Sequence, residues 1–220
     1  MLQLDKMRTA ELFSGTKSFS KVAIDEGHII FTIDDDVALD PQLCIDILKW
    51  DYMSDEYMHQ LDILWASPPC TAFSVASMGH HWHKRGYGFV PKTEDAVIGL
   101  ALLDKTIEII SKTQPRYWYI ENPRGVMRKL IDSLFIKYGI RPYKRVTVTY
   151  CRYGDKRMKP TDIWTNHIDW YPKKMCKNND KCHEASPRGS QTGTAGLKNA
   201  KERGRIPPAL FEEIFKNVKP

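Results

Sequence analysis

Two stretches of sequence decide the fold. They are Leu61–Cys70, which reads LDILWASPPC, and Tyr117–Pro123, which reads YWYIENP. Each begins as an apolar run of strand length and ends in a short loop that contains proline. We interpret the two runs as buried strands of one parallel sheet, with both loops at the carboxyl edge where α/β domains collect their chemistry. The thiol of Cys70 and the carboxyl of Glu121 are therefore expected to meet at that edge.

Apolar runs and helical patterns alternate from residue 9 to about residue 150, which predicts an α/β domain with a mostly parallel, twisted sheet flanked by helices. The expected strands are Ala10–Phe13, His28–Ile33, Leu43–Ile47, Ile63–Ala66, Tyr117–Glu121 and Arg145–Thr149. The expected helices are Ser18–Glu26, Glu94–Lys112, Arg124–Tyr138 and, starting from Pro208 in its first turn, Ala209–Val218. A chain of 220 residues suits one domain with a sizeable core.

The cysteines and the apolar runs indicate an intracellular protein. Five cysteines at irregular spacing argue against a disulfide framework and for reduced thiols; they are Cys44, Cys70, Cys151, Cys176 and Cys182. No run approaches the ~20 apolar residues of a membrane span, and the charged start of the chain does not resemble a secretory signal. We expect a cytoplasmic protein with no membrane partner.

The net charge of +6 is unevenly distributed along the chain. Residues 141–205 carry sixteen Lys and Arg against six Asp and Glu, a balance of +10, so the remainder sums to −4. A basic block of this kind is typical of a nucleic-acid partner, since phosphate contacts supply most non-specific affinity. A solvated loop with surplus lysines explains the charge equally well, and charge alone leaves both interpretations open.

Residues 166–204 have few large aliphatic side chains and no clean periodicity, so they cannot bury a core of their own. This segment is disordered, pinned by a metal or ordered against a partner. Cys176, Cys182 and His183, with His167 as a further ligand, form a zinc candidate, although their spacing is not that of a standard finger or ribbon and zinc is not favoured. Without zinc, phosphates are expected to order the segment through Arg188, Lys198, Lys201, Arg203 and Arg205.

A second basic and aromatic stretch, residues 75–88, contains three neighbouring histidines. They are His80, His81 and His83, and their spacing lacks the helical i, i+4 arrangement of metal sites. We interpret this stretch as a loop that closes over a nucleic acid whose target base must be flipped or single-stranded.

The loop Glu11–Ser18 leaves the first expected strand and enters a helix, so backbone N–H groups and a helix N-terminus face its ligand. The acidic cluster Asp34–Asp36 ends the second strand about twenty residues later, where a carboxylate accepts the hydroxyls of a ribose. The loop holds a single glycine, Gly15, and lacks the GxGxxG fingerprint. A nucleoside without phosphates, such as S-adenosylmethionine, fits it better than a phosphate group.

Taken in order, these motifs resemble the DNA cytosine-5 methyltransferase family, closest to small phage-encoded members with a reduced target-recognition region. The likeness spans Glu11 to Lys216. Glu11–Gly15 resembles the cofactor loop, Ser67–Cys70 the nucleophile loop and Glu121–Pro123 the glutamate-asparagine motif. Tyr153–Asp162 is similar to a divergent form of the motif that carries a glutamine and two arginines, and Gly204–Pro208 resembles the last motif.

The resemblance implies a Rossmann-like S-adenosylmethionine-dependent methyltransferase fold. A catalytic domain would cover residues 1–165, a small basic recognition segment residues 166–205, and a C-terminal helix that packs back on the domain residues 206–220. The implied reaction transfers a methyl group from S-adenosylmethionine to carbon 5 of cytosine, with DNA as the partner. A phage-encoded member would act in the host cytoplasm.

The resemblance also assigns roles to single residues. Cys70 would add as a thiolate to carbon 6 of cytosine, and Glu121, protonated because burial raises its pKa, would relieve the charge at ring nitrogen 3. Cofactor contacts would come from Phe13, Ser14, Gly15, Thr16, Asp34, Asp46 and Pro69, with Asp35 and Asp36 offering the same group as Asp34. Substrate contacts would come from Pro68, Asn122, Arg157 and Lys159.

Other interpretations remain open at this point. The same fold and thiol chemistry suit RNA as the substrate, and a catalytically weak DNA-binding or decoy module is a non-enzymatic alternative. Glu121 has an alternative partner in a salt bridge to Arg124, Asn122 an alternative role as a turn former, and Arg157 and Lys159 alternative positions on an exposed basic hairpin. The sequence leaves the recognition site and the oligomeric state open.

Overall fold

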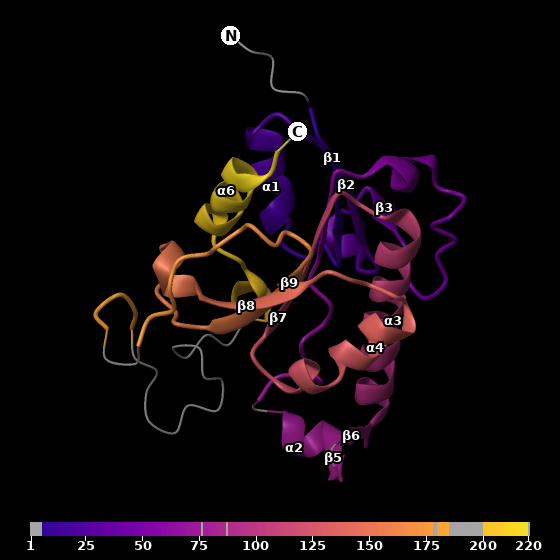
Figure 1. Ribbon diagram of the computed structural model, residues 1–220, viewed down its shortest axis with the longest axis vertical. Coiled ribbons are helices and arrows are strands. Elements are labelled where there is room, and N and C mark those ends of the chain that lie inside the picture. The colour runs from indigo at the N-terminus through magenta and orange to yellow at the C-terminus, as the bar shows by residue number, and fades with distance from the viewer. Residues whose placement is uncertain (1–5, 76, 87, 178–179, 185–199, 220) are drawn as a thin grey trace.

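A seven-stranded sheet organises the chain in the computed structural model, which describes residues 6–75, 77–86, 88–177, 180–184 and 200–219 (Figure 1). Its strand order is β3-β2-β1-β4-β7-β9-β8. The strands are β1 (Arg8–Leu12), β2 (Ile29–Asp34), β3 (Leu43–Cys44), β4 (Ile63–Ala66), β7 (Tyr117–Pro123), β8 (Lys144–Thr149) and β9 (Pro160–Thr165). Only β9 runs antiparallel to the other six strands, which confirms the prediction of a mostly parallel sheet.

Helices cover both faces of the sheet. The helices α1 (Ser18–Asp25) and α6 (Pro208–Asn217) lie side by side on one face, and α3 (Glu94–Thr113) and α4 (Ile131–Lys137) lie on the other (Figure 1). Successive strand side chains point to opposite faces, so β4 supplies both cores. Leu64 and Ala66 join the core under α3, whereas Ile63 and Trp65 join the core under α6.

The termini of α3 carry signals that can be read in the sequence. Thr93 caps its first turn by accepting a hydrogen bond from the backbone N–H of Ala96, and Glu94 and Asp95 complement the positive end of the helix. Lys112 stands in the last turn, and Gln114 ends the helix in a left-handed conformation. These local signals explain why the expected helix Glu94–Lys112 matches the observed one to within a residue.

Three elements differ from the expectation because tertiary pairing overrides local pattern. The strand β9 was not predicted. The expected strand Leu43–Ile47 stops at Cys44, because its partner β2 ends at Asp34 and the chain then leaves the sheet. The expected helix Arg124–Tyr138 is split into the 3-10 turn η3 (Val126–Lys129) and α4, because Gly125 pairs with Ser74 instead of entering a helix.

The remaining elements are short. The stretch 75–88, expected to be a loop, contains α2 (Met78–His81) and the strand β5 (Trp82–Arg85), which pairs with β6 (Gly88–Pro91) in an antiparallel hairpin; residues 76 and 87 lie outside the described residues. The others are η1 (Val37–Leu39), η2 (Glu56–Gln60), η4 (Tyr150–Tyr153) and α5 (Ala200–Gly204). Within the described parts of the chain, no helix is long and apolar enough to span a membrane.

The segment that follows β9 packs on the domain although its described residues, 166–177 and 180–184, form no helix or strand. Trp170 is fully buried in the core under α6, and its indole N–H donates to Glu213 of that helix over 3.2 Å. The amide of Lys173 donates to the hydroxyl of Tyr153. Two basic residues named above, Arg188 and Lys198, lie outside the described residues.

Candidate active site

The loop between β1 and α1 is bent tightly around the end of β2. Phe13 and Gly15 both have positive φ angles, 58° and 47°. The amide of Ser14 donates to the carbonyl of Ile33 over 3.1 Å, and the amide of Gly15 donates to Asp34 Oδ2 over 2.8 Å. Asp34 therefore holds the loop in place from the neighbouring strand.

Glu11 lies beneath this loop and is buried. Its carboxylate accepts hydrogen bonds from the backbone amides of Phe19 and Ser20 and from the hydroxyl of Ser20, so it ties β1 to the first turn of α1. Burial raises the pKa of Glu11 to about 7, the hydrogen bonds from Ser20 and Phe19 act in the opposite direction, and the charge of Asp34 adds to the rise.

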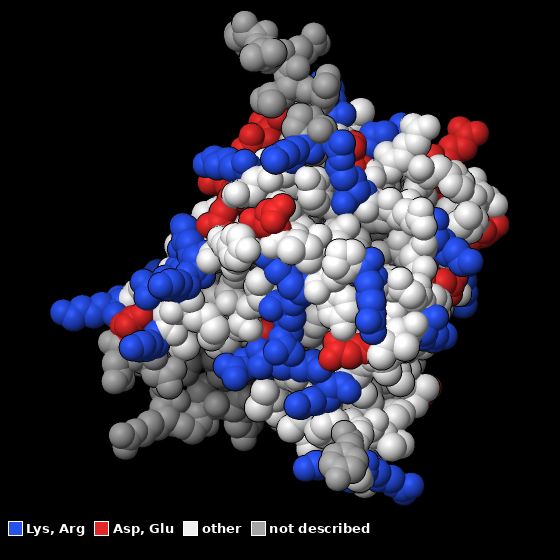
Figure 2. Space-filling model, in the orientation of Figure 1, with Lys and Arg blue, Asp and Glu red and all other residues white. Residues whose placement is uncertain are grey.

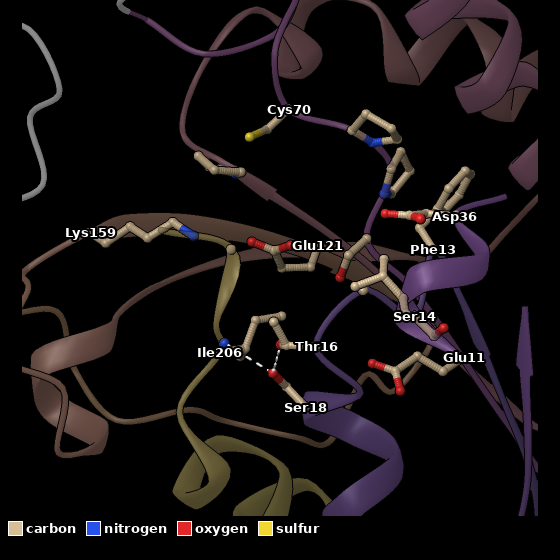
Figure 3. A pocket seen from close by; sticks show the side chains of 17 residues that line it. Glu11, Phe13, Ser14, Thr16, Ser18, Asp36, Cys70, Glu121, Lys159 and Ile206 are labelled. Carbon is tan, nitrogen blue, oxygen red and sulfur yellow. Dashed lines mark hydrogen bonds between the residues drawn. The ribbon is translucent and has the colours of Figure 1, made fainter. Parts of the chain in front are cut away.

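A cavity of about 520 Å³ opens at the carboxyl edge of the sheet, a size typical of small-molecule sites. The loop after β1 forms one part of its wall, and the loop after β4 and the end of β7 form another (Figure 3). Its lining includes Phe13, Ser14, Gly15, Thr16, Asp36, Pro68, Pro69, Cys70, Glu121 and Lys159. Thus the motifs predicted to meet at this edge do line one space.

The loop that carries Cys70 is fixed at several points. The amide of Ser67 donates to the carbonyl of Leu12, and its hydroxyl accepts from the indole N–H of Trp65 over 2.8 Å. Asn122 Nδ2 donates to the carbonyl of Pro68 over 2.9 Å. Cys70 itself is exposed, and Figure 3 shows its sulfur above Glu121 and Lys159. Asn122 thus positions the thiol loop from β7.

Glu121 is buried at the end of β7 and faces the cavity. Burial raises the pKa of its carboxyl, while the charge of Lys159 and hydrogen bonds from Tyr150 and Ser67 act in the opposite direction. The hydroxyl of Tyr150 donates to Glu121 Oε1 over 3.0 Å. The described residues show no ion pair between Glu121 and Arg124, whose amide instead donates to the carbonyl of Pro160.

Lys159 links the two reactive groups electrostatically. Figure 3 shows its ammonium directed toward Glu121. Burial lowers the pKa of Lys159, opposed by the charges of Glu121 and Cys70. The surrounding protein raises the pKa of the Cys70 thiol by desolvation, and the Lys159 ammonium counteracts that rise. The Lys159 ammonium also donates to the carbonyl of Arg203 over 2.8 Å, which joins it to the segment before α6.

Arg157 does not line this cavity. All five N–H groups of its guanidinium donate hydrogen bonds to acceptors within the protein. Its Nε and one terminal nitrogen bind the carboxylate of Asp155, and the terminal nitrogens also donate to the carbonyls of Glu202, Arg203 and Arg205 over 2.9–3.0 Å. The guanidinium of Arg157 is thus fully used in binding Asp155 and the carbonyls of residues 202–205, whereas Lys159 lines the cavity.

The two aspartates expected on the cofactor side lie outside the main cavity. Asp34 and Asp46 line a smaller hollow of about 40 Å³ instead, together with Phe13 and Pro69, which belong to both spaces. The carboxylate of the cluster that lines the main cavity is Asp36, which also caps η1 by accepting from the amide of Ala38. Of the cluster Asp34–Asp36, Asp36 lines the main cavity, whereas Asp34 and Asp35 line the smaller hollow.

Several residues that line the cavity or contact its lining carried no separate signal in the sequence. Glu11, Ser67 and Tyr150 were not expected at the site, although Glu11 and Ser67 belong to the two motifs. Ile206 closes the cavity from the segment before α6, where its amide donates to the hydroxyl of Ser18 over 3.3 Å (Figure 3). Tyr150 was missed because it belongs to η4, which reaches Glu121 only through the β8–β9 pairing.

The histidines of the stretch 75–88 do not form a metal cluster among the described residues. His81 is buried and its Nδ1 lies 2.6 Å from the hydroxyl of Thr93, whereas His80 and His83 are exposed. The indole N–H of Trp82 donates to the carbonyl of Ala72, so the β5–β6 hairpin is anchored directly behind the Cys70 loop. Lys84 and Arg85 are exposed on this hairpin.

Comparisons with known proteins give the site its context. Residues 7–133 match the family model described as C-5 cytosine-specific DNA methylase. A Frog virus 3 (isolate Goorha) protein named "Probable DNA (cytosine-5)-methyltransferase" is 31% identical over 223 residues, which cover 95% of this chain and 99% of that protein.

Two solved structures share the fold. The methyltransferase EhMeth of Entamoeba histolytica superposes with a TM-score of 0.55 at 12% identity, over 79% of this chain and 57% of that one. The Dnmt2 methyltransferase of S. pombe gives 0.53 at 13% identity, over 77% and 52%. The chain thus spans about half the length of these structures, and the likeness confirms the predicted methyltransferase fold.

Proposed function

This chain belongs to the C-5 cytosine-specific DNA methylase family, and from that premise we propose that it methylates carbon 5 of cytosine in DNA through a transient covalent bond from Cys70. The observation that carries the proposal is the cavity that Cys70, Glu121 and Lys159 share with the loop after β1. A thiol, a protonatable carboxyl and a cation surround one space there.

The cavity suits the family's cofactor, S-adenosylmethionine. Among the described residues, the hydroxyl of Ser14 is buried without a hydrogen-bond partner, and Ser14 lines the cavity, so a polar group is required opposite it. Phe13 offers an aromatic face, Asp36 a carboxylate for ribose hydroxyls, and Thr16 a further hydroxyl. When bound there, S-adenosylmethionine supplies an electrophilic methyl group.

The proposed adenine end lies at the smaller hollow. Phe13 and Pro69 line both spaces, so the two form one continuous surface. Asp46 in the hollow would accept a hydrogen bond from the adenine amine, as first expected. In this arrangement Asp34 keeps the loop in shape through Gly15, and Asp36 takes the ribose contact expected of Asp34.

The protein's own residues would act on cytosine as follows. The Cys70 thiolate adds to carbon 6, which makes carbon 5 nucleophilic. Negative charge moves toward ring nitrogen 3, where the protonated carboxyl of Glu121 would donate a hydrogen bond or a proton. The Lys159 ammonium would stabilise the thiolate and approach the cytosine oxygen or a phosphate. After methylation, solvent water would take the proton from carbon 5, and the electrons of that C–H bond would form the 5,6 double bond, expel Cys70 as a thiolate and restore the aromatic ring.

The basic surface supports DNA as the partner. Lys and Arg side chains gather over the part of the molecule where β8 and β9 lie (Figure 2). We propose that residues 1–165 form the catalytic domain, that residues 166–205 contribute to DNA recognition, and that the β5–β6 hairpin with Lys84 and Arg85 closes over the DNA. This surface would supply the phosphate contacts that dominate affinity.

The test is transfer of labelled methyl from S-adenosylmethionine to mixed-sequence duplex DNA, with RNA in parallel and mass analysis of the modified base. We expect 5-methylcytosine in DNA, and Cys70→Ala to lower the rate by about 10³-fold or more because it removes the nucleophile. Cys44→Ser, which alters another exposed thiol, serves as the matched control and should leave the rate unchanged.

Two results would contradict the proposal. Methyl transfer by Cys70→Ala at the wild-type rate would exclude the covalent mechanism, and label found in RNA alone would exclude DNA as the substrate. A protein that binds S-adenosylmethionine but labels neither nucleic acid would exclude the proposed reaction.

A further inference from the structure

Three thiols and one imidazole converge outside the active site. The ligand atoms of Cys151, Cys176, Cys182 and His183 all lie within 4.8 Å of one another. The Sγ atoms of Cys151 and Cys176 are 3.2 Å apart, and those of Cys151 and Cys182 are 3.5 Å apart. His183 Nδ1 lies 3.7 Å from the sulfurs of both Cys176 and Cys182. No other such cluster of metal-binding side chains occurs among the described residues.

These distances are those of a tetrahedral metal site. The four distances above average about 3.5 Å, and a regular tetrahedron with edges of that length has its centre about 2.1 Å from each corner, close to Zn–S bonds of about 2.3 Å and Zn–N bonds of about 2.0–2.1 Å. Three cysteines and one histidine are a common ligand set of structural zinc. Four protein ligands leave no coordination position open for water or substrate, which is typical of a structural metal site and not of a catalytic one.

The two ligand-bearing segments are far apart in sequence and are joined by further contacts. Cys151 belongs to η4, directly after β8, whereas the other three ligands follow β9. The amide of Cys176 donates to the hydroxyl of Thr149 over 3.0 Å, so the backbone of one ligand is fixed beside another. Arg152 forms an ion pair of 2.7 Å with Asp180, and the amide of Glu184 donates to the carbonyl of Lys156.

The burial of the cysteines favours a metal site over a chance grouping of side chains. Cys151 and Cys176 are buried, and Cys182 is partly buried. A disulfide would join only two of the three thiols and leave the third sulfur and the imidazole beside it unexplained. Since the described residues 176–177 and 180–184 form no helix or strand, no regular secondary structure holds them in place. A metal ion would bind all four groups at once.

We propose that Cys151, Cys176, Cys182 and His183 bind one zinc ion that fixes the segment after β9 to η4. This corrects the sequence-based zinc candidate in two ways. Cys151 replaces His167, whose Nδ1 instead lies 2.8 Å from the hydroxyl of Tyr119, and the ligand set becomes complete. Zinc would bind three thiolates and a neutral imidazole, with the thiol protons released to solvent.

The site would also set the position of active-site residues. Tyr150, which donates to Glu121, directly precedes Cys151, and η4 leads into the loop that presents Lys159. The ion would thereby stabilise the wall of the cavity without touching substrate. This inference does not depend on the proposed reaction, because metal content can be measured without any substrate.

The experiment measures metal in the full-length chain, purified under reducing conditions from zinc-supplemented cells. Elemental analysis should give about one zinc per chain. Cys182→Ser, at the partly exposed ligand, should lower that content at least tenfold, and Cys151→Ser should do the same, while Cys44→Ser should keep it. Far-ultraviolet circular dichroism of each variant checks that it folds.

Cobalt substitution gives a second readout. Refolding the chain with Co²⁺ should give the sulfur-to-cobalt charge-transfer absorption of a tetrahedral thiolate site, and this absorption should be lost in Cys182→Ser. The proposal is overturned if the reduced, folded wild type retains no zinc and shows no such absorption. It is equally overturned if mass spectrometry of thiol-blocked protein finds Cys151 and Cys176 joined in a disulfide, or if folded Cys182→Ser and Cys151→Ser retain full zinc.

Discussion

At the scale of single residues, Lys159 acts on both reactive groups of the site, whereas the resemblance of its motif implied only a substrate contact. Its ammonium faces the carboxyl of Glu121 and counteracts the rise that desolvation causes in the pKa of the Cys70 thiol. Cys70 must be deprotonated to act as a nucleophile, and Glu121 must be protonated to act as an acid. The two groups therefore require opposite protonation states in one cavity. The charge of Lys159 favours the thiolate of Cys70, and burial raises the pKa of Glu121 against the opposing charge of Lys159.

Lys159→Met should therefore shift the pH dependence of Cys70 alkylation to higher pH, because the charge that counteracts desolvation of the thiol is removed. The measurement is the rate of iodoacetamide labelling at Cys70 between pH 6 and 10, followed by peptide mass spectrometry. Lys159→Arg keeps the charge and should keep the wild-type profile. An unchanged profile in Lys159→Met would show that the ammonium does not act on Cys70.

At the scale of elements, the Cys70 loop is held against the end of β7 by a close backbone contact. Ser74 pairs with Gly125, and the amide of Val126 donates to the carbonyl of Phe73 over 2.9 Å. A Cβ atom on Gly125 would lie 1.9 Å from the carbonyl oxygen of Phe73. Glycine is needed there because of this approach, since its φ of −176° is open to any residue.

Gly125→Ala should destabilise the fold by about 1–3 kcal/mol, because two backbone segments must separate to admit the methyl group. It should also reduce methyl transfer, since the displaced segment carries the thiol loop. Urea denaturation and the transfer assay measure the two effects. Gly79→Ala is the matched control, as its added Cβ meets nothing within 4 Å. Equal stability of Gly125→Ala and wild type would contradict the close approach.

At the scale of the whole molecule, the fold keeps buried carboxyls whose pKa values are raised. Glu11 is the clearest case, with a pKa of about 7 against an ordinary 4.5. The folded state therefore holds this proton more tightly than the unfolded chain. Its contribution to stability is fully present below pH 4.5 and is lost as the pH rises toward 7. A difference of this size corresponds to about 3 kcal/mol.

Accordingly, the free energy of unfolding of wild type should fall relative to that of Glu11→Gln by about 3 kcal/mol between pH 4.5 and 8, because glutamine does not titrate. Urea denaturation of both proteins at constant zinc concentration measures the difference and cancels the titration of other groups. Glu212→Gln, at an exposed position of α6, should show no such trend. A constant difference between Glu11→Gln and wild type across this range would show that Glu11 titrates normally.

The sequence by itself determined the fold class and the edge of the sheet where the chemistry lies. Strand and helix periodicity, the caps of α3 and the placement of Cys70 and Glu121 after apolar runs are local properties. Local pattern also placed Phe13, Ser14, Gly15 and Thr16 in one loop, which lines the cavity, because a turn from strand to helix needs no distant partner to be recognised.

Only the tertiary structure decided which side chains share a space. The antiparallel β9 lies between β7 and β8 and so brings Lys159 and Tyr150 to Glu121, while the guanidinium of Arg157 turns to the carbonyls before α6. The tertiary structure also places Asp36 at the main cavity and Asp34 outside it, and it brings Cys151 to Cys182, which is 31 residues away. Such contacts between side chains depend on strand register and burial across long sequence separations. The periodicity within one segment carries no information about them.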